Sequence, residues 1–152
     1  MIIFGIDNQF LELKITNYEF PDNQDWDWDS NWLNIYIKVN SKLGNWQTID
    51  PSLTTWEVKK LIDWFNDLSE NKKPENSRLD FTEPNLAFEL KNLSTDHLKS
   101  IIVYFDLESR PKSASDNKEF YIEILSDNNE LKRIASELQL ELSKYPEKRP
   151  KT

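Results

Sequence analysis

The stretch Thr54-Thr-Trp-Glu-Val-Lys-Lys-Leu-Ile-Asp-Trp-Phe-Asn-Asp-Leu68 decides the fold of this 152-residue chain. Thr54 followed three residues later by Glu57 has the spacing of a capping box, which satisfies the free amides of a first helical turn. Charged and amide side chains share one face of the resulting helix. The opposite, apolar face consists of Val58, Leu61, Ile62, Phe65 and Leu68. The stretch therefore predicts an amphipathic helix with a defined start, which needs apolar partners elsewhere in the chain.

Most of the remaining chain alternates between apolar and polar residues with the period of a strand. The alternating segments are 2–6, 11–15, 33–39, 46–49, 79–81, 86–90 and 120–124. The segment 101–105 is apolar on both faces, which predicts a strand in the interior of a sheet. In the first hairpin we expect one dry face, formed by Ile2, Phe4 and Ile6 on the first strand and by Leu11, Leu13 and Ile15 on the second. We also expect Asp50-Pro51 to end the strand that precedes the helix.

A second helix is predicted near the end of the chain. Asp127 is its expected cap, an apolar face runs from Leu131 to Tyr145, and Pro146 is expected to end it. Strands joined by short turns favour antiparallel pairing. The predicted fold class is α+β, with a mainly antiparallel sheet packed against a central helix and a C-terminal helix. We expect a single domain over residues 1–146 and a frayed polar tail over residues 147–152.

The composition excludes several classes of protein. Cysteine is absent, which excludes a disulfide framework, a thiolate nucleophile and a Cys-ligated zinc site. The start at residues 1–6 lacks the basic region of a signal peptide, and no apolar run approaches the roughly 20 residues of a membrane span. We therefore expect a cytoplasmic protein without a membrane partner. The sequence leaves the oligomeric state open.

The charge is unevenly distributed. The whole chain carries a net charge of −8, and residues 1–31 hold seven acidic residues and one lysine, a net charge of −6. An acidic surface repels nucleic acid phosphates and attracts basic proteins. No basic patch interleaved with aromatic residues is present. The chain is thus not expected to bind nucleic acid.

Candidate catalytic and metal-binding patterns are incomplete. His97 is the only histidine and falls in a turn-like segment, and two glycines are too few for a phosphate-binding loop. Asp25, Asp27 and Asp29 match the first, third and fifth positions of a calcium loop. That pattern then fails, because Ser30 replaces the required glycine and the bidentate glutamate is missing. We predict no enzyme, no metal and no cofactor.

One alternative stays open at this point. Asp80, Glu83 and Glu89 supply carboxylates of the kind that hydrolases use in pairs for acid–base chemistry. A small-ligand-binding protein or a hydrolase that uses these surface carboxylates in a cleft is therefore the competing hypothesis. Convergent carboxylates of raised pKa in a closed pocket would favour it, whereas an acidic face with exposed tryptophan would favour a protein partner.

Tryptophans and acidic residues together suggest a surface for a protein partner. Trp26 and Trp28 lie in the acidic loop, and Trp56 lies on the polar side of the first helix. Tryptophan is a common interface anchor, although the same residues often plug a core instead. On charge and aromatic character, the predicted partner-binding residues are Asp22, Asp25, Trp26, Asp27, Trp28, Asp29, Trp56 and Glu83.

The order of several motifs resembles that of the WapI family of bacterial immunity proteins over residues 9–146. These motifs are Tyr18-Glu-Phe-Pro21, Asn31-Trp-Leu-Asn-Ile35, Trp46, Leu53-Thr-Thr-Trp-Glu-Val58 with Leu61-Ile-Asp-Trp64, Phe81-Thr-Glu-Pro-Asn-Leu-Ala-Phe88 and the closing Lys144-Tyr-Pro146. The resemblance implies a cytoplasmic protein that binds the C-terminal domain of a cognate polymorphic toxin and blocks it in the producing cell and its siblings. Toxins of this kind that degrade nucleic acids have basic substrate surfaces, which an acidic partner would occlude. The resemblance to the family does not identify any site residues in this chain.

Overall fold

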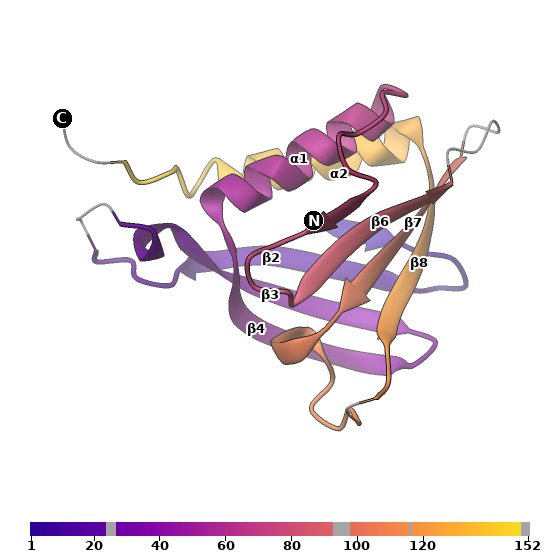
Figure 1. The fold of residues 1–152 in the computed structure, drawn as a ribbon, viewed down its shortest axis with the longest axis horizontal. Coiled ribbons are helices and arrows are strands. Elements are labelled where there is room, and N and C mark those ends of the chain that lie inside the picture. The colour runs from indigo at the N-terminus through magenta and orange to yellow at the C-terminus, as the bar shows by residue number, and fades with distance from the viewer. Residues whose placement is uncertain (24–26, 93–97, 116, 150–152) are drawn as a thin grey trace.

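The computed structural model describes residues 1–23, 27–92, 98–115 and 117–149. Its strands form two antiparallel four-stranded sheets, and a pair of helices lies along one side of both (Figure 1). The predicted α+β class, with antiparallel strands, a central helix and a C-terminal helix, is confirmed.

Each sheet is assembled from consecutive strands. The first sheet has the order β1 (Ile2–Phe4), β2 (Phe10–Tyr18), β3 (Trp32–Ser41) and β4 (Gly44–Thr54). The second has the order β5 (Arg78–Asp80), β6 (Leu86–Asn92), β7 (Leu98–Phe105) and β8 (Phe120–Asp127). The apolar strand β7 is thus interior, as its sequence predicts. Two short 3-10 turns, η1 (Asp29–Asn31) and η2 (Leu107–Ser109), follow β2 and β7.

The first helix, α1 (Thr55–Ser69), begins at the predicted cap. The Thr54 hydroxyl accepts from the Glu57 amide at 3.3 Å, and the Glu57 carboxylate accepts from the Thr54 amide at 3.0 Å. The other carboxylate oxygen accepts from the Thr82 amide at 2.8 Å, so Glu57 also holds the turn between β5 and β6. All five residues of the predicted apolar face are buried.

The core lies between the helices and the inner faces of the sheets. Phe65 of α1 packs edge-on against Phe88 of β6, with ring centroids 5.8 Å apart. Away from the helices, Trp46 of β4 contacts Phe105 and Phe120 at 5.5 and 5.4 Å and so joins the two sheets. Burial of large aromatic side chains stabilises all three contacts.

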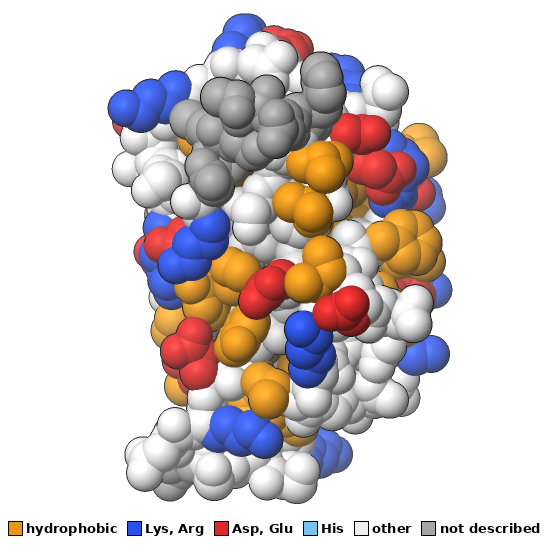
Figure 2. Space-filling model, turned by 90° about the vertical axis from the view of Figure 1, so that its right-hand side faces the viewer, with side chains coloured by type: hydrophobic (Ala, Val, Ile, Leu, Met, Phe, Trp, Pro, Cys, Tyr) orange, Lys and Arg blue, Asp and Glu red, His pale blue; other side chains and the backbone are white. Residues whose placement is uncertain are grey.

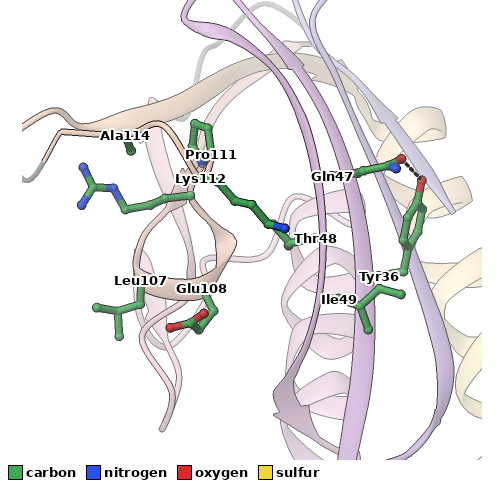
Figure 3. Close-up of a pocket in the computed structure, with 10 residues that line it drawn as sticks. Tyr36, Gln47, Thr48, Ile49, Leu107, Glu108, Pro111, Lys112 and Ala114 are labelled. Carbon is green, nitrogen blue, oxygen red and sulfur yellow. Dashed lines mark hydrogen bonds between the residues drawn. The ribbon is translucent and has the colours of Figure 1, made fainter.

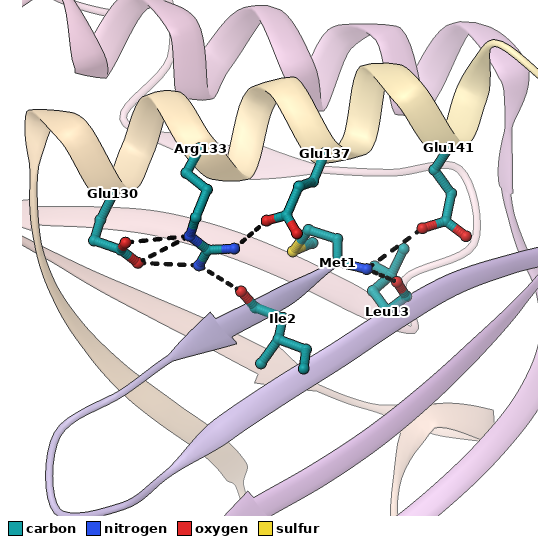
Figure 4. A network of polar contacts seen from close by, with 7 residues as sticks. All are labelled: Met1, Ile2, Leu13, Glu130, Arg133, Glu137 and Glu141. Carbon is teal, nitrogen blue, oxygen red and sulfur yellow. Dashed lines mark hydrogen bonds and ion pairs between the residues drawn. The ribbon is translucent and has the colours of Figure 1, made fainter.

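The second helix, α2 (Asn128–Leu142), is fastened to the first strands by a polar network (Figure 4). The Arg133 guanidinium pairs with Glu130 and Glu137 on its own helix and donates to the Ile2 carbonyl at 2.7 Å. Glu141 accepts from the Met1 amine at 3.4 Å and from the Ile15 amide at 3.1 Å. These contacts link the end of the chain to β1 and β2.

The predicted dry face of the first hairpin is confirmed for Leu11, Leu13 and Ile15, which are buried, but is wrong for the first strand. Ile3 is buried, whereas Phe4 is 60% exposed. The register pairs Ile3 with Leu11, which places both on the core side. Left-handed backbone at Asp7 and Asn8 (φ 52° and 62°) shapes the connecting loop. A shift by one residue reverses the face of a strand, so alternation alone did not fix the register.

The strand β4 continues past Asp50-Pro51, where we expected it to end. The register shifts between Leu33 and Ile35 of β3, because these residues pair with Leu53 and Asp50 of β4, which lie three positions apart instead of two. Pro51 sits in the resulting bulge on an edge strand, where a missing amide breaks no ladder hydrogen bond.

The end of the chain also differs from expectation. The helix α2 ends at Leu142, before Pro146, and the Tyr145 amide donates to the Leu142 carbonyl at 2.8 Å. The expectation of a frayed tail is wrong at Lys148, whose ammonium lies 4.1 Å from the centroid of the Tyr18 ring. The described part of the tail thus packs against the end of β2.

Candidate functional site

An open hollow of about 670 Å³ forms where four loops meet beside β4. The loops are the end of β2, the η1 turn, the turn between β5 and β6, and η2. We call this site the acidic hollow. It is lined by Glu19, Phe20, Trp28, Asp29, Trp32, Asp50, Pro51, Glu83 and Glu108.

Five of these nine lining residues are carboxylates. None of the five forms an ion pair with any residue that the structure describes. Asp50 accepts a hydrogen bond from the Asn85 amide nitrogen at 2.8 Å, which fixes its position and leaves its charge in place. A concave surface lined by uncompensated charges of one sign focuses the electrostatic potential and attracts ligands of opposite charge.

The charges in the hollow act on one another. Burial raises the pKa of the Glu19 carboxyl, and the nearby charges of Asp29, Asp50 and Glu83 raise it further. Like charges disfavour ionisation of their neighbours, so the upward shift reflects an unneutralised cluster. A cation placed among these groups would reverse the effect and lower the pKa of Glu19.

Aromatic side chains flank the carboxylates. Trp28 is 54% exposed and Phe20 is 45% exposed, whereas Trp32 is buried. The Trp28 ring rests on the half-buried Trp56 of α1, with centroids 4.7 Å apart and planes at 70°. An exposed ring held on a second ring offers a large contact area at little conformational cost.

The loop that carries Trp28 and Asp29 is anchored from beneath. The Asp27 carboxylate accepts from the Ser30 amide at 2.8 Å and from its hydroxyl at 2.7 Å, and these bonds lower the pKa of Asp27. Asn31, fully buried, accepts from the Thr55 hydroxyl at 3.0 Å, which ties the loop to the start of α1. The side-chain amide of Asn31 also donates to the Lys148 carbonyl at 3.0 Å.

The hollow brings together three of the predicted partner-binding residues: Trp28, Asp29 and Glu83. Trp56 supports Trp28 from behind. Asp22 and Asp27 are exposed but do not line the hollow. Asp25 and Trp26 lie outside the described residues, as does His97.

Among the carboxylates and exposed aromatic residues that line the hollow, sequence reasoning missed four, namely Glu19, Phe20, Asp50 and Glu108. Glu19 and Phe20 stand next to the acidic loop, within a motif of the family resemblance, and that position is a signal that could have found them. No local signal marks the other two, because Asp50 reaches the hollow through the β4 bulge and Glu108 through η2.

The carboxylates of the hydrolase hypothesis have different surroundings. Glu83 lines the acidic hollow, but Asp80 pairs with Arg78 at 3.1 Å and Glu89 pairs with Lys91 at 3.0 Å. The ion pair with Lys91 and the hydrogen bond from Tyr104 lower the pKa of Glu89, which is opposite to the shift that a general acid requires. The three carboxylates of that hypothesis are therefore not brought together, and the hollow in which Glu83 lies near Glu19, whose pKa is raised, is open rather than a closed pocket.

The described residues form neither a cluster of metal-ligating side chains nor a membrane-spanning helix. Within the described ranges, no group of three or more His, Cys, Asp or Glu side chains has a geometry that could hold a metal ion. None of the helices in the part of the chain that the structure describes is both long and apolar enough to span a bilayer.

A second surface of mixed character covers the outer face of the second sheet (Figure 2). There, Leu98, Tyr121 and Leu125 are partly exposed, and hydrophobic side chains alternate with side chains of both charges. Its charges are largely compensated, as in the pairs of Arg78 with Asp80 and Lys91 with Glu89. The acidic hollow is the more strongly charged of the two surfaces.

Comparison with known proteins identifies a family to which most of the chain is similar. The model of a family described as the immunity protein WapI-like family matches residues 1–146. The match covers both sheets, both helices and every residue that lines the acidic hollow. No curated protein and no solved structure matches the chain.

Proposed function

The chain belongs to the WapI-like immunity protein family, and we propose that it binds and neutralises the C-terminal domain of a cognate polymorphic toxin through the acidic hollow. In this proposal it acts as a stoichiometric inhibitor in the cytoplasm of the producing cell and its siblings, without turnover. The toxin domain presents a basic surface, of the kind that a nuclease uses to hold its substrate.

The observation that carries the proposal is the set of five unpaired carboxylates around exposed aromatic rings. A basic partner gains ion pairs there without first breaking any pair among the described residues, which lowers the cost of desolvation on binding. Trp28 and Phe20 add apolar contact at the rim of the charged region. A partner that fills the hollow would also compete with phosphates for the same basic groups.

Growth rescue tests the proposal. The C-terminal domain of a candidate toxin encoded by a neighbouring gene would be expressed under tight control, with and without the chain. We expect rescue of growth and a complex that co-purifies and weakens as salt rises. A toxic domain that the chain neither binds nor neutralises would refute the pairing.

Charge reversal tests the surface. We expect the double variant Asp29→Lys, Glu83→Lys to lose rescue and to bind at least about tenfold more weakly, because two favourable charge contacts become repulsive. The double variant Glu75→Lys, Glu119→Lys is the matched control, since it makes the same change in charge at two exposed residues that do not line the hollow. Equal rescue by all three proteins would place the contact elsewhere while leaving the immunity function intact.

A further inference from the structure

The strand β4 forms one edge of the first sheet, with β3 on one side only. Outside that ladder, the backbone groups of Asn45, Gln47 and Ile49 make no hydrogen bond with any residue in the described ranges. An unpaired edge of this kind is a template for another strand unless charge, proline or a bulge blocks it. Here the bulge and Pro51 block only the end of β4 that leads into α1.

The ladder geometry shows which backbone groups face outward. The β3–β4 hairpin closes through the two residues Lys42 and Leu43, so the flanking pair Ser41–Gly44 is hydrogen-bonded. Hydrogen-bonded and non-hydrogen-bonded pairs alternate along an antiparallel ladder. The amides and carbonyls of Asn45, Gln47 and Ile49 therefore point away from β3, toward the free edge.

A groove of about 570 Å³ runs beside this free edge. Figure 3 shows β4 with Gln47, Thr48 and Ile49 on one side, and the loop that carries Leu107 and Pro111 on the other. Two apolar side chains are exposed here, Ile49 at 62% and Leu107 at 52%. We call this feature the β4 groove.

The β4 groove and the acidic hollow are parts of one continuous surface. Glu108 lines both of them, and the consecutive residues Ile49 and Asp50 line the groove and the hollow respectively. A chain segment that lies along β4 would therefore reach the five carboxylates at one end. This continuity indicates an occupant that is extended, partly apolar and basic toward the hollow.

We propose that an extended segment of the toxin domain adds to the first sheet along β4, pairing its backbone with Gln47 and Ile49. This inference rests on the proposed function and deepens it. Apolar side chains of the segment lie against Ile49 and Leu107, and a basic side chain meets Glu108. Backbone pairing at a sheet edge supplies affinity, and the side-chain contacts supply specificity.

Amide hydrogen exchange of the chain, free and in complex with the toxin domain, tests the pairing directly. In the free chain the amides of Gln47 and Ile49 exchange rapidly, and in the complex their exchange slows by about a hundredfold or more, as expected for newly bonded backbone groups. The Thr48 amide is the internal control, because it bonds to β3 and is protected in both states.

A proline variant gives an independent test. Gln47→Pro removes the outward amide without breaking the β3 ladder, whereas the matched control Gln47→Ala keeps that amide and removes only the side chain. We expect Gln47→Pro to weaken binding by about tenfold or more, since a toxin carbonyl loses its donor, and Gln47→Ala to bind within about threefold of the parent chain. Thermal unfolding of both variants checks that the fold is retained.

The outcomes separate the two proposals. Rescue and salt-sensitive binding with unprotected Gln47 and Ile49 amides would overturn the pairing along β4 and leave the acidic hollow as the contact. Protection of both amides together with loss of binding in Gln47→Pro would support it. A toxin domain that does not bind the chain at all would overturn both the proposed function and this inference.

Discussion

Replacing Glu57 by alanine should destabilise the fold more than any other change of a polar residue at the start of α1. Glu57 is only 6% exposed, and its carboxylate accepts three hydrogen bonds. Two come from the amide and hydroxyl of Thr54 at 3.0 and 3.1 Å, and the third comes from the Thr82 amide at 2.8 Å. The side chain therefore caps the helix and clasps the turn that carries Glu83.

The expected cost follows from these contacts. Loss of a capping interaction costs about 1 kcal/mol. A hydrogen bond to a charged group contributes about 1.5–3 kcal/mol, so loss of the Thr82 contact adds a similar or larger amount. Relief of the buried charge offsets part of the total, and we expect a net loss of about 2–4 kcal/mol. For a domain of this size that corresponds to a fall in Tm of about 6–12 °C.

Urea unfolding followed by tryptophan fluorescence measures this loss. Lys60→Ala is the matched control, because Lys60 is exposed on the same helix and its loss should change the free energy of unfolding by less than about 0.5 kcal/mol. Glu57→Gln keeps one acceptor and should fall between the two. A fall in the free energy of unfolding of less than about 1 kcal/mol in Glu57→Ala would refute the view that the contacts of Glu57 with Thr54 and Thr82 stabilise the fold.

Three further outcomes are expected. Because the pKa of Glu19 is raised in the folded state, the folded protein takes up a proton at a higher pH than the unfolded chain does. The free energy of unfolding should therefore rise as the pH falls through that raised pKa. Glu19→Gln should abolish this rise and be more stable than the parent near neutral pH, which urea midpoints across a pH series will show. Trp28→Ala should change the free energy of unfolding by about 0.5–1.5 kcal/mol, the typical value of one aromatic pair, but should weaken toxin binding about tenfold or more in calorimetry if the exposed ring is an anchor. Phe88→Ala empties a fully buried site among Phe65, Trp64 and Phe81 and should cost about 3–5 kcal/mol in urea unfolding; a much smaller cost would mean that the core collapses to fill the space.

The sequence predicted those parts of the fold that rest on local physics. The capping box at Thr54 and Glu57 and the spacing of the apolar face act within a few residues, so α1 was predictable. The β1 face and the extent of β4 were not, because both depend on pairing partners. A five-residue loop sets the register of Ile3 against Leu11, and a bulge carries the strand past Pro51.

Only the part of the acidic hollow that comes from one local stretch of sequence was predictable. Trp28 and Asp29 belong to a stretch whose composition is unusual by itself. Glu83, Asp50 and Glu108 come from three other segments and converge only when the two sheets and η2 are in place. Composition therefore indicated that the surface is acidic and aromatic, whereas the fold determined which residues line it.

The contacts of Lys148 have a consequence for the rate at which a partner is captured. The Lys148 ammonium donates to the carbonyls of Phe20 and Asn23 at 3.1 Å each, and its amide donates to Asn31 at 2.8 Å. Ordering a backbone residue costs about 1–2 kcal/mol, and a segment already held in place does not incur that cost during an encounter. A chain of this fold without an equivalent lysine would therefore present Trp28 on a looser support and associate more slowly with its partner.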